Sequence, residues 1–285
     1  MLGKLFGKNS RKKPSKTDDK ARSPKPAAKT SNKSSLKPSK ASAPKASGTE
    51  RAAKPKSPAK PKAPKKIWTP AEYVVAEQEG KTRFHSLGLE VDLLHGIADL
   101  GYEYCSEIQA ESLPHTLKGH DVIGKAQTGT GKTAAFLITI VNDLLRRPIP
   151  KGDRFSSEPR ALIIAPTREL AMQIEKDAVA LTKHVDMPVY SVLGGIDYQK
   201  QKEHVRGQVI DILVATPGRL IDFLNSSDLY LDQLDFLVID EADRMLDMGF
   251  INDIKKIIRF LPKQRQNLLF SATFSDDIRN LAKGM

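Results

Sequence analysis

The sequence has little of what several common classes of protein depend on. Its 285 residues include one cysteine and one tryptophan, and aromatic residues make up 6% of the chain. A single cysteine excludes a disulfide-stapled scaffold and a cysteine-rich zinc site. No apolar run approaches the roughly 18 residues that a membrane-spanning helix needs. Because the start of the chain also lacks the pattern of a secretory signal, we expect a cytoplasmic protein without a membrane span.

Acidic residues are scarce at the start of the chain. Residues 1–66 contain 21 Lys and Arg but only three acids, which gives them a formal charge of +18. The whole chain carries +12, so residues 67–285 carry −6. The first segment is rich in Lys, Pro, Ala and Ser, and such a composition cannot bury enough apolar surface to offset the entropy of ordering. We predict a disordered basic tail at 1–66, followed by a linker at 67–83 with a short helix at 70–79.

Two roles are open for this tail. Each Lys or Arg that neutralises a phosphate releases counterions, so the tail can act as a nonspecific, salt-sensitive arm for RNA. It can equally be a solvated tether that keeps the protein soluble.

The rest of the chain alternates short apolar runs with segments of helical period. We predict strands at 121–124, 161–165, 189–193, 212–215, 236–239 and 268–271. Helices are predicted between them at 133–147, 168–183, 197–205, 218–225 and 250–260. Apolar strands separated by helices indicate an α/β domain with a parallel sheet between two helical layers. Ligands bind such sheets at the carboxyl ends of the strands.

A glycine-rich segment follows the first predicted strand and enters a helix. It reads Ala126, Gln127, Thr128, Gly129, Thr130, Gly131, Lys132 and Thr133. In such a loop, backbone N–H groups and the helix dipole converge on a phosphate group. Lys132 is expected to reach the β- and γ-phosphates of a nucleotide, and the Thr133 hydroxyl to bind Mg²⁺. The strict pattern has glycine where this chain has Ala126.

An acidic pair follows the apolar strand at 236–239. Asp240 is expected to hold Mg²⁺ through water, and Glu241 to orient or deprotonate the attacking water. Such a pair alone is common at helix starts, but the phosphate loop earlier in the chain favours the metal site.

Residues 240–243 read Asp-Glu-Ala-Asp, and with the other motifs they resemble the ATP-binding domain of DEAD-box RNA helicases, in particular the bacterial RhlB/RhlE-like branch. The resemblance covers about residues 81–285 and implies a RecA-like domain at 84–285 that uses ATP and Mg²⁺. Residues 84–109 resemble the adenine-reading Q motif of the family. It implies that Phe84 stacks on the base and that the Gln109 amide reads its donor–acceptor edge.

Three further motifs follow the predicted strands at 161–165, 189–193 and 212–215. They resemble the family's RNA-contacting motifs, whose residues here are Pro166, Thr167, Arg168, Gly194, Gly195, Thr216, Pro217, Gly218 and Arg219. Glycines, Thr hydroxyls and helix N-termini suit contact with phosphate and sugar, which implies little sequence specificity. Ser271 and Thr273 match the motif that links hydrolysis to unwinding, and the resemblance implies that their hydroxyls contact Asp243.

The resemblance implies an ATP-dependent RNA helicase. Nothing here resembles the family's second RecA-like domain, so we expect a fragment with little activity alone. A non-catalytic RNA-binding module is the main alternative, although a retired site would be expected to lose Glu241; a DNA translocase is less compatible with the Q motif. We expect a monomer whose protein partners belong to RNA decay or ribosome assembly.

Deleting residues 1–66 is expected to weaken RNA affinity and to flatten its dependence on salt, while nucleotide affinity stays the same. Titrations of RNA at several salt concentrations measure both quantities. An unchanged salt slope would make the tail a tether.

Overall fold

The computed structural model describes residues 68–285, so the predicted tail at 1–66 lies outside the described residues. Within this part of the chain, a six-stranded sheet has the order β1-β6-β5-β2-β4-β3, and every neighbouring pair is parallel. The strands are Val122–Lys125 (β1), Ala161–Ile164 (β2), Val189–Val192 (β3), Ile212–Ala215 (β4), Phe236–Ile239 (β5) and Gln266–Ser271 (β6). The predicted parallel sheet is therefore confirmed, with shifts of one or two residues at the strand ends.

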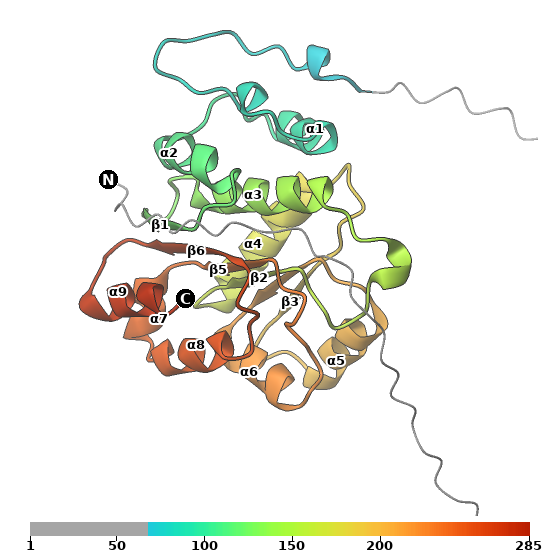
Figure 1. Ribbon diagram of the computed structural model, residues 1–285, viewed down its shortest axis with the longest axis vertical. Helices are drawn as coiled ribbons and strands as arrows, with labels where there is room; N and C mark the ends of the chain where they lie inside the picture. Colours follow the sequence, from blue (N-terminus) through green and yellow to red (C-terminus); the bar gives the residue numbers. More distant parts are fainter. Residues whose placement is uncertain (1–67) are drawn as a thin grey trace, which may run out of the picture. The chain divides into compact units, whose positions relative to one another are not determined.

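Helices cover both faces of the sheet (Figure 1). The α-helices of the described residues are Val91–Asp99 (α1), Glu107–Thr116 (α2), Lys132–Arg146 (α3), Arg168–Leu181 (α4), Tyr198–Gly207 (α5), Pro217–Asn225 (α6), Ala242–Asp247 (α7), Ile251–Ile258 (α8) and Asp276–Lys283 (α9). All five predicted helices are present as α3, α4, α5, α6 and α8, whereas α1, α2, α7 and α9 were not predicted. None of these helices is both long enough and apolar enough to cross a membrane.

Side chains alternate along the central strands between two apolar layers. Ile163 of β2 packs in the layer that contains α1 to α4, whereas the neighbouring Leu162 packs in the layer that contains α6 and α8. Every residue of β2, β4, β5 and β6 is buried, while the edge strands β1 and β3 are partly exposed. This burial on both faces explains why β2, β4 and β5 are apolar at every position, whereas β6 also buries Gln266, Asn267 and Ser271.

The segment before the domain contacts the core. Trp68 and Tyr73 pack against the layer of α1 to α4, and Val75 is 8% exposed. The helix predicted at 70–79 is wrong beyond one 3₁₀ turn, Pro70–Glu72. The chain then stays extended, and the Val75 carbonyl accepts a hydrogen bond from the Arg83 guanidinium at 3.1 Å rather than from a helical N–H.

Helices α1 and α4 approach closely at Gly96, where a Cβ would lie 2.3 Å from the carbonyl oxygen of Leu181. We expect Gly96→Ala to lower the free energy of unfolding by about 1–3 kcal/mol, the usual cost of overpacking. Alanine normally stabilises a helix relative to glycine, so this effect has the opposite sign. Urea unfolding measures it. The control is Gly207→Ala in α5, where a Cβ meets nothing within 4 Å and no loss is expected. Equal stability of Gly96→Ala and the wild type would contradict this packing.

Candidate nucleotide and RNA site

The loop between β1 and α3 has the backbone of a phosphate cradle. Gly129 and Gly131 have φ of 84° and 93°, a left-handed conformation that favours glycine. At Gly131 a Cβ would also lie 2.5 Å from the Nε2 atom of Gln109. The loop therefore needs glycine at this position for both its backbone conformation and its contact with α2.

A buried ion pair joins this loop to the end of β5. The Lys132 ammonium lies 2.9 Å from Oδ1 of Asp240 and 3.4 Å from Oε1 of Glu241. Lys132 is 3% exposed and Asp240 is fully buried. The three residues are therefore in direct contact, as expected, although Lys132 precedes the acidic pair by more than a hundred positions.

One oxygen of the Asp240 carboxylate has no hydrogen-bond partner. Burial raises the pKa of this carboxyl, and the nearby Lys132 charge only partly opposes the rise. Its Oδ1 atom accepts a hydrogen bond from the Glu241 N–H at 2.9 Å, whereas the buried Oδ2 atom has no hydrogen-bond partner. A buried carboxylate oxygen without a hydrogen-bond partner is of the kind that Mg²⁺ prefers as a ligand, directly or through water.

Glu241 is held as a carboxylate. Burial works to raise its pKa, but the Thr128 hydroxyl, at 2.8 Å from Oε1, and the charges of Lys132 and Arg244 outweigh burial and lower the pKa. Its φ of 54° is left-handed, a strained conformation for glutamate that recurs at functional sites. Glu241 is therefore ionised at neutral pH, as a base for water must be.

The Q motif supports the phosphate loop. The Gln109 amide donates to the carbonyl of Gly131 at 2.9 Å and accepts from the Ser106 N–H at 2.8 Å. The Ser106 hydroxyl in turn donates to the Thr130 carbonyl at 2.7 Å. Gln109 thus connects the start of α2 to the phosphate loop through both atoms of its amide.

The structure does not place Phe84 where it could stack on a base. Phe84 is 1% exposed and packs in the core, with its ring centroid 6.1 Å from that of Tyr102. Tyr102 is 39% exposed, and its side chain is the aromatic one beside Gln109 in a pocket. We therefore replace Phe84 with Tyr102 as the stacking candidate. Tyr102 lies within the Q motif recognised at 84–109, but the spacing of residues in that motif does not show which of its aromatic side chains is exposed.

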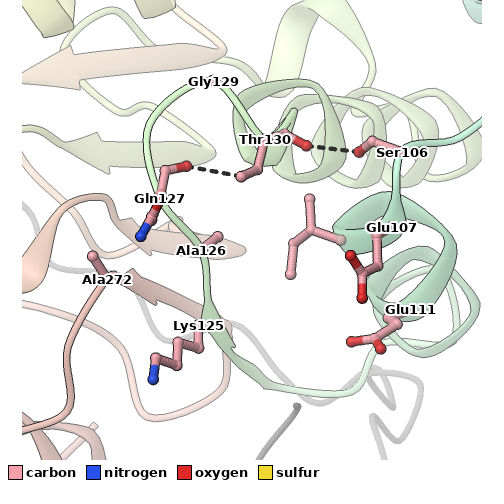
Figure 2. A pocket seen from close by; sticks show the side chains of 10 residues that line it. Ser106, Glu107, Glu111, Lys125, Ala126, Gln127, Gly129, Thr130 and Ala272 are labelled. Atoms are coloured by element: carbon pink, nitrogen blue, oxygen red, sulfur yellow. Dashed lines mark hydrogen bonds between the residues drawn. The ribbon is translucent and has the colours of Figure 1, made fainter.

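Pockets lie on both sides of the loop. One, of about 390 Å³, contains Tyr102, Gln109, Lys132 and Thr133, so it brings the predicted base-reading and phosphate-binding residues together. The other, of about 560 Å³, lies between the start of the loop and α2 (Figure 2). Its lining includes Ser106, Glu107, Glu111, Lys125, Ala126, Gln127 and Ala272. Of these two pockets, only the first contains Lys132 and Thr133, the residues expected to bind the phosphates and Mg²⁺.

The segment after β6 contacts the acidic motif. The Asp243 carboxylate accepts from the backbone N–H of Thr273 at 3.0 Å and from its hydroxyl at 3.3 Å. The Ser271 hydroxyl accepts from the Asp243 N–H at 3.2 Å and donates to the Thr273 carbonyl at 2.7 Å. The contacts expected between these residues are present.

The three predicted RNA motifs meet at one end of the sheet. Gly194 donates its N–H to the Thr216 hydroxyl at 3.3 Å. Gly195, with φ of 73°, lies so close to Arg168 that a Cβ would be 2.5 Å from the guanidinium. The remaining predicted residues are Pro166, Thr167, Pro217, Gly218 and Arg219, at the starts of α4 and α6.

Nucleotide and RNA motifs follow different halves of the sheet. The phosphate loop, the Ser271–Thr273 turn and Asp240 follow β1, β6 and β5, which are neighbours. The RNA motifs follow β2, β4 and β3, which are also neighbours. Along the chain, the three predicted RNA motifs lie between the phosphate loop and Asp240. In the sheet, the two groups of motifs are separated into neighbouring halves.

Comparison with known families agrees with this geometry. A model of the DEAD/DEAH box helicase family matches residues 106–281. The chain belongs to this family. The helicase domain is 58% identical over 212 residues to the ATP-dependent RNA helicase RhlB of Pseudomonas aeruginosa, covering 74% of this chain and 53% of that protein.

RhlB proteins of other bacteria are similar as well. The Pseudomonas putida protein is 58% identical over 212 residues, with 74% of this chain and 53% of that protein covered. The Shewanella baltica protein is 48% identical over 202 residues, with 70% and 46% covered. The chain thus spans about half the length of the curated relatives it matches, and the resemblance to RhlB-like helicases is confirmed.

Tyr102→Ala is expected to weaken ATP binding by about 1–3 kcal/mol, the usual value of stacking one base on an aromatic ring. Titration with a fluorescent ATP analogue in the presence of Mg²⁺ measures the affinity. Phe84→Leu is the comparison: it is expected to lower the free energy of unfolding and to leave the affinity of the folded protein unchanged. The reverse pattern would restore Phe84 as the stacking residue.

Proposed function

We propose that the protein is an ATP-dependent RNA helicase, in which ATP hydrolysis is coupled to local unwinding of RNA. The observation that carries the proposal is the contact of Lys132 with both Asp240 and Glu241 in one buried site. That site lies beside the Gln109-containing pocket and in the same sheet as the backbone-binding motifs. Membership of the helicase family supports the same activity.

In this proposal the phosphates of ATP lie on the loop that contains residues 126–133. The backbone N–H groups of Gln127 to Gly131 and the start of α3 bind the anionic oxygens. Lys132 turns from Asp240 toward the β- and γ-phosphates, and Thr133 and Asp240 are the residues that would hold Mg²⁺. When bound, this ion neutralises charge that develops on the phosphates.

Glu241 is proposed to accept the proton of the attacking water. Its pKa lies below the ordinary range, so the residue is available as a base at neutral pH. Thr128 and Arg244 hold its two carboxylate oxygens at 2.8 and 3.3 Å and so orient the group. The site thus contains a positioned base as well as a phosphate cradle.

RNA is proposed to bind through its backbone across the motifs at 166–168, 194–195 and 216–219. Glycines allow close approach of the sugar–phosphate chain, and the 2′-hydroxyl gives a preference for RNA. Asp243, Ser271 and Thr273 are proposed to couple the two events, since their hydrogen bonds lie next to Glu241 on one side and at the end of β6 on the other.

The wider setting is also a proposal. We infer action in the cytoplasm as a monomer, with protein partners from RNA decay or ribosome assembly. The second RecA-like domain typical of the family would supply the remainder of the ATP and RNA sites.

Glu241→Gln in the full-length protein is expected to reduce RNA-stimulated ATP turnover by about 10²–10⁴-fold, the usual contribution of a general base. ATP and RNA affinities are expected to change little, because glutamine has nearly the same shape. Steady-state ATPase assays and equilibrium titrations measure these quantities. Unchanged turnover would exclude Glu241 as the base, and absence of turnover in the wild type would favour a non-catalytic RNA-binding module.

A further inference from the structure

A buried carboxylate contacts three residues of α5, the helix that begins directly after the loop at 194–197. This loop contains the two glycines of the second predicted RNA motif. Asp228 is 1% exposed. Its carboxylate accepts a hydrogen bond from the Tyr198 hydroxyl at 2.6 Å and lies 3.1 Å from the Lys202 ammonium and 2.5 Å from the Arg206 guanidinium. Burial works to raise the pKa of this carboxyl, but Tyr198, Lys202 and Arg206 outweigh burial and lower the pKa. The Oδ1 atom has no hydrogen-bond partner and is paired only with the Arg206 charge. Asp228 therefore fixes Tyr198, the first residue of α5, directly after the loop.

The ring of Tyr198 also contacts the third RNA motif. The Arg219 guanidinium carbon lies 5.5 Å from the centroid of this ring, within the range of a cation–π contact. Phe223 supports the ring from α6, at a centroid distance of 4.8 Å. The Tyr198 hydroxyl is thus bonded to Asp228, its ring packs against Phe223, and the face of the ring lies under the Arg219 guanidinium.

Arg219 also contacts the backbone of the loop at 194–197. Its guanidinium donates to the Ile196 carbonyl at 2.9 Å, and its side chain is only 11% exposed. By contrast, Arg168 is exposed and lies against Gly195. A continuous series of contacts therefore runs from Asp228 through Tyr198 and Arg219 to the backbone of the loop.

We propose that Asp228 and Tyr198 are positioning residues for RNA binding, which act by holding Arg219 and the 194–197 loop in the arrangement that accepts the RNA backbone. Neither residue needs to touch RNA. This inference rests on the proposed binding of RNA by these motifs, and it adds residues that lie outside them.

Electrostatics alone predicts the opposite result for Asp228. Removing a negative charge near an RNA surface, and releasing Lys202 and Arg206 from their ion pairs, should strengthen the binding of a polyanion. A positioning role predicts weaker binding, because the phenol and the loop lose their support. The sign of the change in RNA affinity therefore separates the two explanations.

The experiment measures the affinity of the full-length protein for a short single-stranded RNA, with a non-hydrolysable ATP analogue present, by fluorescence anisotropy over a series of salt concentrations. Tyr198→Phe removes one hydroxyl and is expected to weaken RNA binding about three- to tenfold, as the loss of a buried hydrogen bond would. Asp228→Asn is expected to weaken it at least as much. The slope of affinity against salt should stay unchanged in both, since no phosphate contact is lost.

Two variants serve as references. Arg168→Gln is expected to lower the salt slope by about 0.7, the value for one phosphate contact with a single strand. Asp232→Asn makes the same charge change as Asp228→Asn at an exposed position in the same connection, and its RNA affinity is expected to equal or slightly exceed that of the wild type. Affinity for the ATP analogue alone is expected to be the same in all variants.

A double-mutant cycle tests the route. If Tyr198 acts through Arg219, the effects of Tyr198→Phe and Arg219→Gln are expected to be less than additive. The inference would be overturned if Tyr198→Phe and Asp228→Asn bound RNA as tightly as the wild type, or more tightly. It would also be overturned if both variants lost as much affinity for the ATP analogue as for RNA, because that result indicates general unfolding. No RNA binding by the wild type would overturn the proposed function itself, and this inference with it.

Discussion

The nucleotide half of the molecule depends on the buried contact between Lys132 and Asp240. Removing both charges from water costs several kcal/mol for each ion, and the 2.9 Å contact offsets this cost only while the geometry is kept. The left-handed conformation of Gly129 and Gly131 positions Lys132 at the start of α3, and Asp240 is positioned directly after β5. Under the proposed function, the phosphates of ATP pair with Lys132 in place of Asp240, and the Asp240 carboxylate is then available to Mg²⁺.

The sheet was predictable because its central strands are buried on both faces. Such strands are apolar at nearly every position, as in Phe236–Ile239, and they stand out from the amphipathic helices between them. Three of the helices that were missed have features that interrupt or shorten a helical pattern. Helix α2 contains Pro114, α1 contains Gly96 for contact with α4, and α7 has only six residues. In the segment wrongly predicted as a helix at 70–79, the carbonyls of Val75 and Ala76 accept hydrogen bonds from the side chains of Arg83 and Tyr104, contacts that local sequence does not reveal.

The candidate site was predictable where its residues are consecutive. The phosphate loop, Asp240 with Glu241, and the Ser271–Thr273 turn follow strands directly, so their side chains had to meet at one edge of the sheet. The exchange of Phe84 for Tyr102 depends on burial, which the motif does not encode. Asp228 was not found either, because its contact with Tyr198 joins residues 30 positions apart that form no recognised pattern.

The division of the sheet into two halves has a consequence for how such a domain can diversify. The boundary lies between β5 and β2, which are joined along their full length by backbone hydrogen bonds that are independent of side-chain identity. Under the proposed function, loops after β2, β4 and β3 can therefore accept substitutions and insertions that alter RNA preference without moving the residues proposed to bind ATP. The proposed ATP site can in this way be retained while the proposed RNA-binding surface changes.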